Sequence, residues 1–87
     1  MRKRHLRTLK AIFEEPTRAN IAWSAIESLL LALGAEITEG KGSRVRFYLI
    51  GRKAVFHRSH PRKETIKAAV ESVRDYLDKA GVNNDIE

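Results

Sequence analysis

Residues 44–57 of this 87-residue chain read RVRFYLIGRKAVFH, and this stretch decides the fold. Apolar side chains recur at every second position on each side of Gly51. Successive side chains of a β-strand point to opposite faces of its sheet, so this alternation predicts two antiparallel strands with a turn at Gly51. The side chains expected to face a core are Val45, Phe47, Ala54 and Phe56.

A helix is predicted just upstream, over residues 24–33, with Trp23 immediately before it. Ser24 and Glu27 have the spacing of a capping box, and the apolar residues that follow recur at helical spacing. Gly34 is placed to end this helix, because glycine adopts the positive φ of a helix C-terminus without steric cost. The apolar period then changes to two, which predicts a short strand in AEITE. The expected core positions of the helix are Ile26, Leu29, Leu30 and Leu33.

The helix expected over residues 65–80 has the clearest pattern. An apolar stripe runs along it as far as Gly81, which is placed to end it. The opposite side is charged, and we expect that side to face solvent. The stripe consists of Ile66, Ala69, Val70, Val73, Leu77 and Ala80, and the charged side of Lys67, Glu71, Arg74, Asp75 and Asp78.

A shorter helix is predicted near the N-terminus, over residues 6–14. The order helix, helix, three strands, helix defines an α+β fold in which a three-stranded antiparallel sheet packs on helices. A chain of this length has room for one core, so residues 1–87 are expected to form a single domain. The apolar stripe of the N-terminal helix consists of Leu6, Leu9, Ile12 and Phe13.

Positive charge is concentrated on the predicted hairpin. The net charge is +6 and the isoelectric point about 10.1, which favours a polyanionic partner such as nucleic acid. No acidic residue lies between Glu39 and Glu64, although a solvated sheet face normally carries both signs of charge. The sheet face away from the core is therefore interpreted as a phosphate-binding surface. It is expected to carry Arg44, Arg46, Tyr48 and His57.

Five segments follow one another in a distinctive order within residues 23–82: ESLLLALGAEI, GSRVRF, GRKAVF, HPRKE and DKAGV. In this order they resemble the HicA family of toxins, which are small bacterial mRNA interferases from type II toxin–antitoxin pairs. The resemblance implies a ribonuclease that inhibits translation and is neutralised by a HicB-type antitoxin. It also implies the fold of the double-stranded RNA-binding domain. Residues 1–22 would then be an N-terminal extension and residues 83–87 a tail.

One position departs from the family pattern. The residue after Gly-Ser is usually the catalytic histidine of the family, and here it is Arg44. The family's second histidine, before proline, is kept as His60, and His57 is an additional imidazole. Metal-independent RNA cleavage needs a base, an acid and cations that stabilise the crowded phosphorus centre. We therefore expect His60, or alternatively His57, to transfer protons, and Arg44 to act on phosphate charge.

The expected RNA contacts surround these imidazoles. Arginine and lysine stay charged and offer directed donors to phosphate, and the amides of a tight turn can hold a phosphate oxygen. A tyrosine on the same face can stack on a base. The residues expected to bind RNA are Lys41, Ser43, Arg44, Arg46, Tyr48, Arg58, Arg62 and Lys63.

The sequence indicates no metal and no small-molecule cofactor. There is no cysteine, and the pair His57 and His60 lacks two further ligands at a suitable spacing. The Gly-Lys-Gly turn is too short for a P-loop. The longest apolar run, SLLLALGA, is far shorter than a membrane span, and MRKRHLR is not followed by the apolar core of a signal sequence. A cytoplasmic protein without membrane contact is expected.

Three hypotheses about function follow. The first is a HicA-like ribonuclease that acts on mRNA or other single-stranded RNA and has a HicB-type antitoxin as its partner. The second is a non-catalytic RNA-binding module on the same fold, because Arg44 replaces the usual histidine. The third is a small DNA-binding regulator, for which the helices and the basic N-terminal segment are the only support.

Overall fold

The structure, a computed structural model, describes residues 2–58 and 64–82. The three strands form one antiparallel sheet in the order β1-β2-β3, and the predicted α+β fold is confirmed. In chain order the elements are α1 (Lys3–Ile12), α2 (Trp23–Ala32), β1 (Glu36–Glu39), β2 (Arg44–Leu49), β3 (Arg52–His57) and α3 (Lys67–Lys79).

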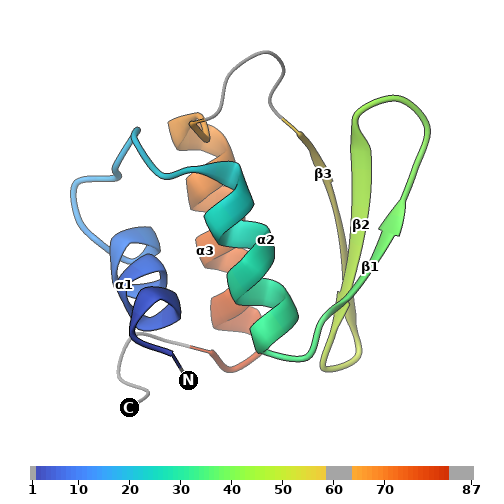
Figure 1. Cartoon of the computed structure of the whole chain (residues 1–87), viewed down its shortest axis with the longest axis horizontal. Coiled ribbons are helices and arrows are strands. Elements are labelled where there is room, and N and C mark those ends of the chain that lie inside the picture. Colours follow the sequence, from blue (N-terminus) through green and yellow to red (C-terminus); the bar gives the residue numbers. More distant parts are fainter. Residues whose placement is uncertain (1, 59–63, 83–87) are drawn as a thin grey trace.

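The elements form three layers (Figure 1). The sheet and α1 lie at opposite ends of the longest dimension, which measures 35 Å, and α2 and α3 form the layer between them. The middle layer therefore covers one face of the sheet and supports α1 on its other side. The second face of the sheet is left open to solvent.

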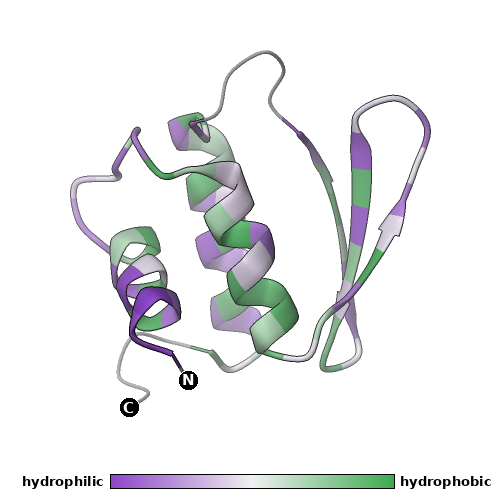
Figure 2. Ribbon diagram, viewed as in Figure 1, coloured by the Kyte–Doolittle hydropathy of each residue, from purple (hydrophilic) through white to green (hydrophobic). Residues whose placement is uncertain are grey.

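Aromatic rings join the sheet to the middle layer. The rings of Phe47 and Phe56 meet edge to face at 5.7 Å, and Trp23 of α2 lies 6.2 and 5.9 Å from them. Tyr76 of α3 lies 6.1 Å from Phe56. Edge-to-face contacts of this kind add to the large apolar area that aromatic side chains bury. The predicted alternation of β2 is confirmed, since its residues are exposed and buried in turn. Figure 2 shows a matching alternation in their hydropathy.

Glycines end α2 and α3, as predicted. Gly34 has a φ of +98° and Gly81 a φ of +85°. After α2, the amide of Ala35 donates to the carbonyl of Leu30 at 2.9 Å, which closes a Schellman motif, and α3 ends in the same way. A Cβ at either glycine would meet no other atom within 4 Å, so the backbone conformation and not space selects glycine.

The predicted capping box is wrong. Helix α2 begins one residue earlier, at Trp23, with Ala22 at the N-cap position and no side-chain capping bond. The carboxylate of Glu27 instead accepts hydrogen bonds from the indole of Trp23 and from the guanidinium of Arg58. A charge-assisted bond from an arginine is stronger than a bond from a neutral amide, which explains why the local motif does not form.

The apolar stripe of α3 differs from the prediction at its first position. Ile66 precedes the helix in an extended conformation and is 49% exposed. Tyr76, which the prediction left out, is buried, and its hydroxyl donates to the carbonyl of Arg52 at 2.8 Å. The polar tip of tyrosine requires such a partner when the ring is buried. Of the other predicted stripe positions, Val70, Val73 and Leu77 are buried as expected, whereas Ala69 and Ala80 are only partly buried.

Helix α1 begins and ends earlier than the predicted residues 6–14, and it buries His5, Leu9 and Ile12. Arg74 of α3, expected to face solvent, is half-buried and fastens the C-terminal end of α1. Its guanidinium donates to the carbonyls of Ile12 at 2.8 Å and Glu14 at 3.1 Å. A cation at the C-terminus of a helix satisfies unpaired carbonyls and complements the helix dipole. The first helix is therefore an integral part of the fold.

Candidate nucleic-acid interface

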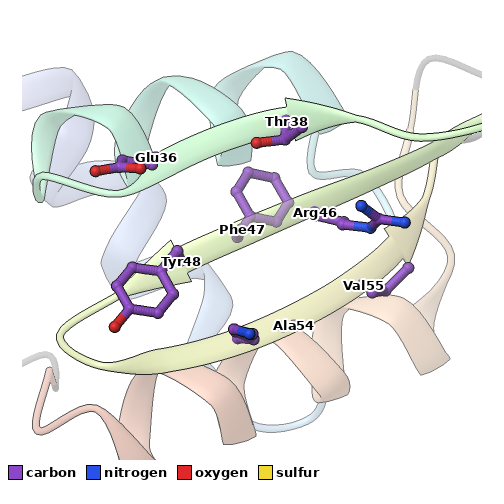
Figure 3. Close-up of a pocket in the computed structure, with 8 residues that line it drawn as sticks. Glu36, Thr38, Arg46, Phe47, Tyr48, Ala54 and Val55 are labelled. Carbon is purple, nitrogen blue, oxygen red and sulfur yellow. The ribbon is translucent and has the colours of Figure 1, made fainter.

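The open sheet face is built from the outward-pointing side chains of all three strands. Every one of these side chains is exposed to solvent. Figure 3 shows Tyr48 and Arg46 on β2, with Thr38 of β1 and Val55 of β3 beside them. The open sheet face consists of Glu36, Thr38, Arg44, Arg46, Tyr48, Lys53, Val55 and His57.

An arginine and a histidine face each other at one end of this surface. Arg44 of β2 is the register partner of His57 at the end of β3. The amide of Arg58 donates to the carbonyl of Ser43 at 2.9 Å, which makes Arg44 and His57 a non-hydrogen-bonded pair of the ladder. Facing side chains come closest in pairs of this type. The sheet therefore brings a permanent cation and an imidazole side by side.

Farther along the same face, an aromatic ring lies beside further cations. Arg46 and Tyr48 line a shallow cavity of about 360 Å³ together with Lys53 and Val55 of β3 and Thr38 of β1 (Figure 3). Tyr48 is 45% exposed, so its ring is accessible to a ligand. A planar ring among cations suits a strand of nucleic acid, because bases stack on rings while phosphates pair with charges.

The charge of the open sheet face is positive. Arg44, Arg46 and Lys53 lie on it, and Glu36 is the acidic residue at its edge among the residues that the structure describes. Glu39, which also belongs to β1, is turned toward Arg58. The face therefore offers several cations to an anionic ligand and little competition from its own carboxylates.

The turn between β1 and β2 positions Arg44, the first residue of β2 on the open sheet face. The amide of Gly40 donates to the carbonyl of Arg44 at 3.0 Å, and Gly42 has a φ of +62°. A Cβ at Gly40 would lie 3.1 Å from the Cβ of Arg44, so a side chain there would push against Arg44. Lys41 is exposed in this turn and Ser43 is half-buried. Glycine at position 40 thus permits the close approach that places Arg44.

Arg58 lies at the edge of the open sheet face and is held by two carboxylates. Its Nε donates to Glu27 of α2 at 2.7 Å, and its Nη1 donates to Glu39 of β1 at 2.6 Å. The hydrogen bonds that Arg58 donates to Glu39 and Glu27 raise the pKa of Arg58, and the bond that Glu39 accepts lowers the pKa of Glu39. Arg58 thereby links α2, β1 and the end of β3. Its predicted role as a phosphate contact stays a prediction, and a phosphate there would compete with both carboxylates.

The other predicted site residues divide into two groups. His57 is exposed at the end of β3, beside Arg44. His60, Arg62 and Lys63 lie outside the residues that the structure describes. Lys53 was not among the predicted site residues, although the alternation that places Val55 and His57 on the open sheet face places Lys53 there too.

Two further properties of the described residues bear on the class of protein. Within residues 2–58 and 64–82, no group of three or more histidine, aspartate or glutamate side chains is arranged to hold a metal ion. In that same part of the chain, no helix is long and apolar enough to cross a membrane.

One of the comparisons with known proteins found a match, and it agrees with this fold. A family model described as the HicA toxin of bacterial toxin–antitoxin systems matches residues 23–82, which is well over half of the chain. The chain belongs to the HicA toxin family, and this membership implies an antitoxin partner. Among the curated proteins and the solved structures compared with it, none is similar enough to count as a match. The matched range includes α2, the sheet and α3, whereas α1 precedes it.

Proposed function

We propose that this toxin is an mRNA interferase that binds single-stranded RNA on the open sheet face, cleaves it and thereby inhibits translation. The observation that carries the proposal is the pairing of Arg44 with His57 at one end of a basic face that also bears Tyr48. The family membership supports a toxin, and the charge and ring of the face support RNA as its substrate.

The proposed reaction is an internal displacement at phosphorus. A base takes the proton of a ribose 2′-hydroxyl, the 2′-oxygen bonds to phosphorus, and the bond from phosphorus to the 5′-oxygen breaks. An acid then protonates the departing 5′-oxygen. His60, which the family pattern retains, is the leading candidate for proton transfer, and His57 is the second. Arg44 would stabilise the charge that accumulates on the non-bridging oxygens.

The remaining cations would bind the strand on either side of the cleaved bond. Arg46 and Lys53 lie along the open sheet face from the Arg44–His57 pair, and Tyr48 offers a ring for one base. The turn residues Lys41 and Ser43 adjoin the same pair. Arg58, Arg62 and Lys63 complete the proposed RNA contacts.

We further propose that the partner is a HicB-type antitoxin that covers the open sheet face. The face combines cations with exposed Tyr48 and with Val55, which is 54% exposed. Protein interfaces place apolar and aromatic groups at their centre and use complementary charge to guide association. An acidic partner with an apolar centre would therefore mask the RNA site directly.

A cleavage assay with purified protein tests the catalytic part of the proposal. The parent is compared with His57→Ala, His60→Ala and Arg44→His, and His5→Gln serves as a control because the His5 imidazole is buried against Ser28 of α2. Removal of the proton-transfer residue should lower the cleavage rate by a factor of about 10² to 10⁴. Full activity in both alanine variants would eliminate histidine as the proton-transfer group.

The same assay addresses the second candidate function, a non-catalytic RNA-binding module. Arg44 at the position of the usual family histidine is the observation that favours it. That function predicts no cleavage by the parent protein, together with RNA binding that depends on the open sheet face. Cleavage that appears only in Arg44→His would show that the parent retains the binding surface and lacks the family's base.

A further inference from the structure

Helix α1 carries a concentration of positive charge on the side of the molecule away from the sheet. Residues 2–13 contain five arginines and lysines and no acidic residue. All five side chains are exposed, and none forms an ion pair with any residue that the structure describes. These cations are Arg2, Lys3, Arg4, Arg7 and Lys10.

Three of these cations form a straight stripe. At 3.6 residues per turn, Lys3, Arg7 and Lys10 project within about 60° of one another and extend over about 10 Å of the helix. The buried residues His5, Leu9 and Ile12 project in the opposite direction, into the middle layer. We call Lys3, Arg7 and Lys10 the α1 stripe. Because the other side of α1 is in the core, the stripe is held in a fixed position.

The α1 stripe works against the stability of its own helix. The first turn of α1 has no acidic residue, although the N-terminus of a helix favours negative charge. Lys3 and Arg7 are four residues apart and Arg7 and Lys10 are three apart, so like charges are neighbours on the helix surface. An anion bound along the stripe would relieve both effects. Lys10, in the last turn, complements the helix dipole, but fold stability does not account for Lys3 and Arg7.

We propose that the α1 stripe is a second RNA-binding surface, which holds the phosphate backbone of the substrate strand without reading its sequence. The inference rests on the proposed binding of RNA to the open sheet face. Both surfaces are basic and they lie on opposite sides of the middle layer (Figure 1). A strand long enough to pass around that layer engages both surfaces, and the linkage raises its affinity above that of either surface alone.

The chemistry of the stripe favours a nucleic-acid backbone over a protein or a membrane. The exposed large apolar residues of the described chain are Leu31, Tyr48, Ile50, Val55 and Ile66, and none of them belongs to α1. A protein interface needs an apolar centre, and a helix that lies in a membrane surface needs a free apolar side. The apolar side of α1 is buried in the core. Phosphate groups, by contrast, require only the charges.

The test compares two triple variants with the same change in net charge. One removes the α1 stripe (Lys3→Gln, Arg7→Gln and Lys10→Gln), and the control removes exposed cations elsewhere (Arg18→Gln, Lys67→Gln and Lys79→Gln). Glutamine is a good helix former, so the stripe variant should melt at the parent temperature or above it. Affinity is measured for two single-stranded RNAs, of about 4 and about 30 nucleotides, at several salt concentrations.

Loss of the stripe should weaken binding of the long RNA roughly a hundredfold at low salt and lower the slope of log affinity against log salt by about 2. The short RNA, which cannot reach both surfaces, should bind as it does to the parent. Long-RNA affinity equal to that of the control variant would overturn the inference. Tighter binding of single-stranded DNA than of RNA would overturn the assignment to RNA.

Arg46→Gln separates this inference from the proposed function. It should weaken binding of both RNAs, because it acts on the open sheet face. If Arg46→Gln weakens both and the stripe variant weakens neither, the α1 surface is excluded and the proposed RNA site stands. If the stripe variant weakens the long RNA and Arg46→Gln weakens neither, the proposed RNA site is excluded.

Discussion

The two basic surfaces of this molecule differ in what accompanies the charge. On the open sheet face, two arginines and a lysine lie next to a tyrosine, a valine and a histidine. On the α1 stripe, cations stand alone, and every apolar residue of the helix points toward the core or is partly covered. Charge by itself can hold a phosphate backbone, whereas stacking on a base and transfer of a proton require the other groups. The aromatic ring and the imidazole beside the cations therefore distinguish the open sheet face, as a candidate reaction site, from the α1 stripe, as a candidate site for holding the backbone.

Helix α3 supports both basic surfaces. Residues of α3 lie beneath both, since this helix packs on the sheet through Tyr76 and on α1 through Arg74. Changes in α3 should affect both surfaces, and changes in α1 should affect one.

The largest effect is expected for Val73→Asp, which places a charge in the shared support. Val73 is fully buried in the hydrophobic core. Burial of an unpaired charge costs several kcal/mol, which is a large part of the roughly 5–15 kcal/mol that stabilises a small domain. The variant should lose its cooperative thermal transition in circular dichroism. Ser72→Asp, at an exposed position of the same helix, should melt like the parent, and an unchanged melting temperature in Val73→Asp would contradict the assignment of layers.

Leu9→Ala should separate α1 from the rest of the fold. Leu9 is 1% exposed between α1 and the middle layer, and truncation of a buried leucine costs about 2–5 kcal/mol. Urea denaturation measures the loss, with Arg7→Ala as the control at an exposed position of the same helix. A loss equal to that of the control would mean that α1 does not belong to the core, and the fixed position of the α1 stripe would be lost with it.

Ile50→Asn should stabilise the hairpin that displays the open sheet face. Ile50 and Gly51 form a two-residue turn with φ values of +50° and +76°, and Leu49 pairs with Arg52 across it. A β-branched side chain at positive φ is strained, and asparagine adopts this conformation at lower cost. We expect a gain of about 1 kcal/mol in the free energy of unfolding. A loss of stability, with RNA affinity unchanged, would show that the exposed isoleucine contributes contacts that the structure does not reveal.

The smallest effect is expected from the titration of His5. The imidazole is buried, its Nε2 lies 3.0 Å from the Ser28 hydroxyl, and desolvation, followed by the charges of Arg4 and Arg2, lowers its pKa. The unfolded chain then binds a proton more readily than the folded protein does, so stability should fall as the pH drops below about 6.5. Urea midpoints at neutral and mildly acidic pH measure this dependence. His5→Gln should weaken it, and an identical pH dependence in the variant would assign the effect to other groups.

Local patterns determined most of the fold. The alternation around Phe47 fixed the two faces of the sheet, and Gly34 and Gly81 marked the helix ends because few other residues adopt positive φ. The predictions that were wrong depended on distant partners. Glu27 does not form the predicted capping box because it accepts a hydrogen bond from Arg58, which lies 31 residues farther along the chain. Arg74 does not face solvent because it donates to the carbonyls of Ile12 and Glu14, which lie 60 or more residues earlier in the chain.

In the candidate site, too, some positions follow from local sequence patterns and others depend on distant partners. The outward positions of Arg44, Arg46, Tyr48 and His57 follow from strand periodicity alone. The position of Arg58 between two carboxylates does not, because Glu27 and Glu39 belong to different elements. The α1 stripe followed only in part, because the helix predicted over residues 6–14 includes Arg7 and Lys10 but not Lys3. Only the buried side of α1 shows that its cations are held in place.

The central claim is that RNA binds to the open sheet face, and an NMR titration tests it most directly. Isotope-labelled protein is titrated with a short 2′-O-methyl RNA, which lacks the free hydroxyl that the proposed cleavage requires. We expect the amide signals of Arg44, Arg46, Tyr48, Lys53 and His57 to shift on binding, and Arg46→Gln to reduce these shifts. Saturable binding with shifts confined to the exposed side of α3, and none on the open sheet face, would contradict it.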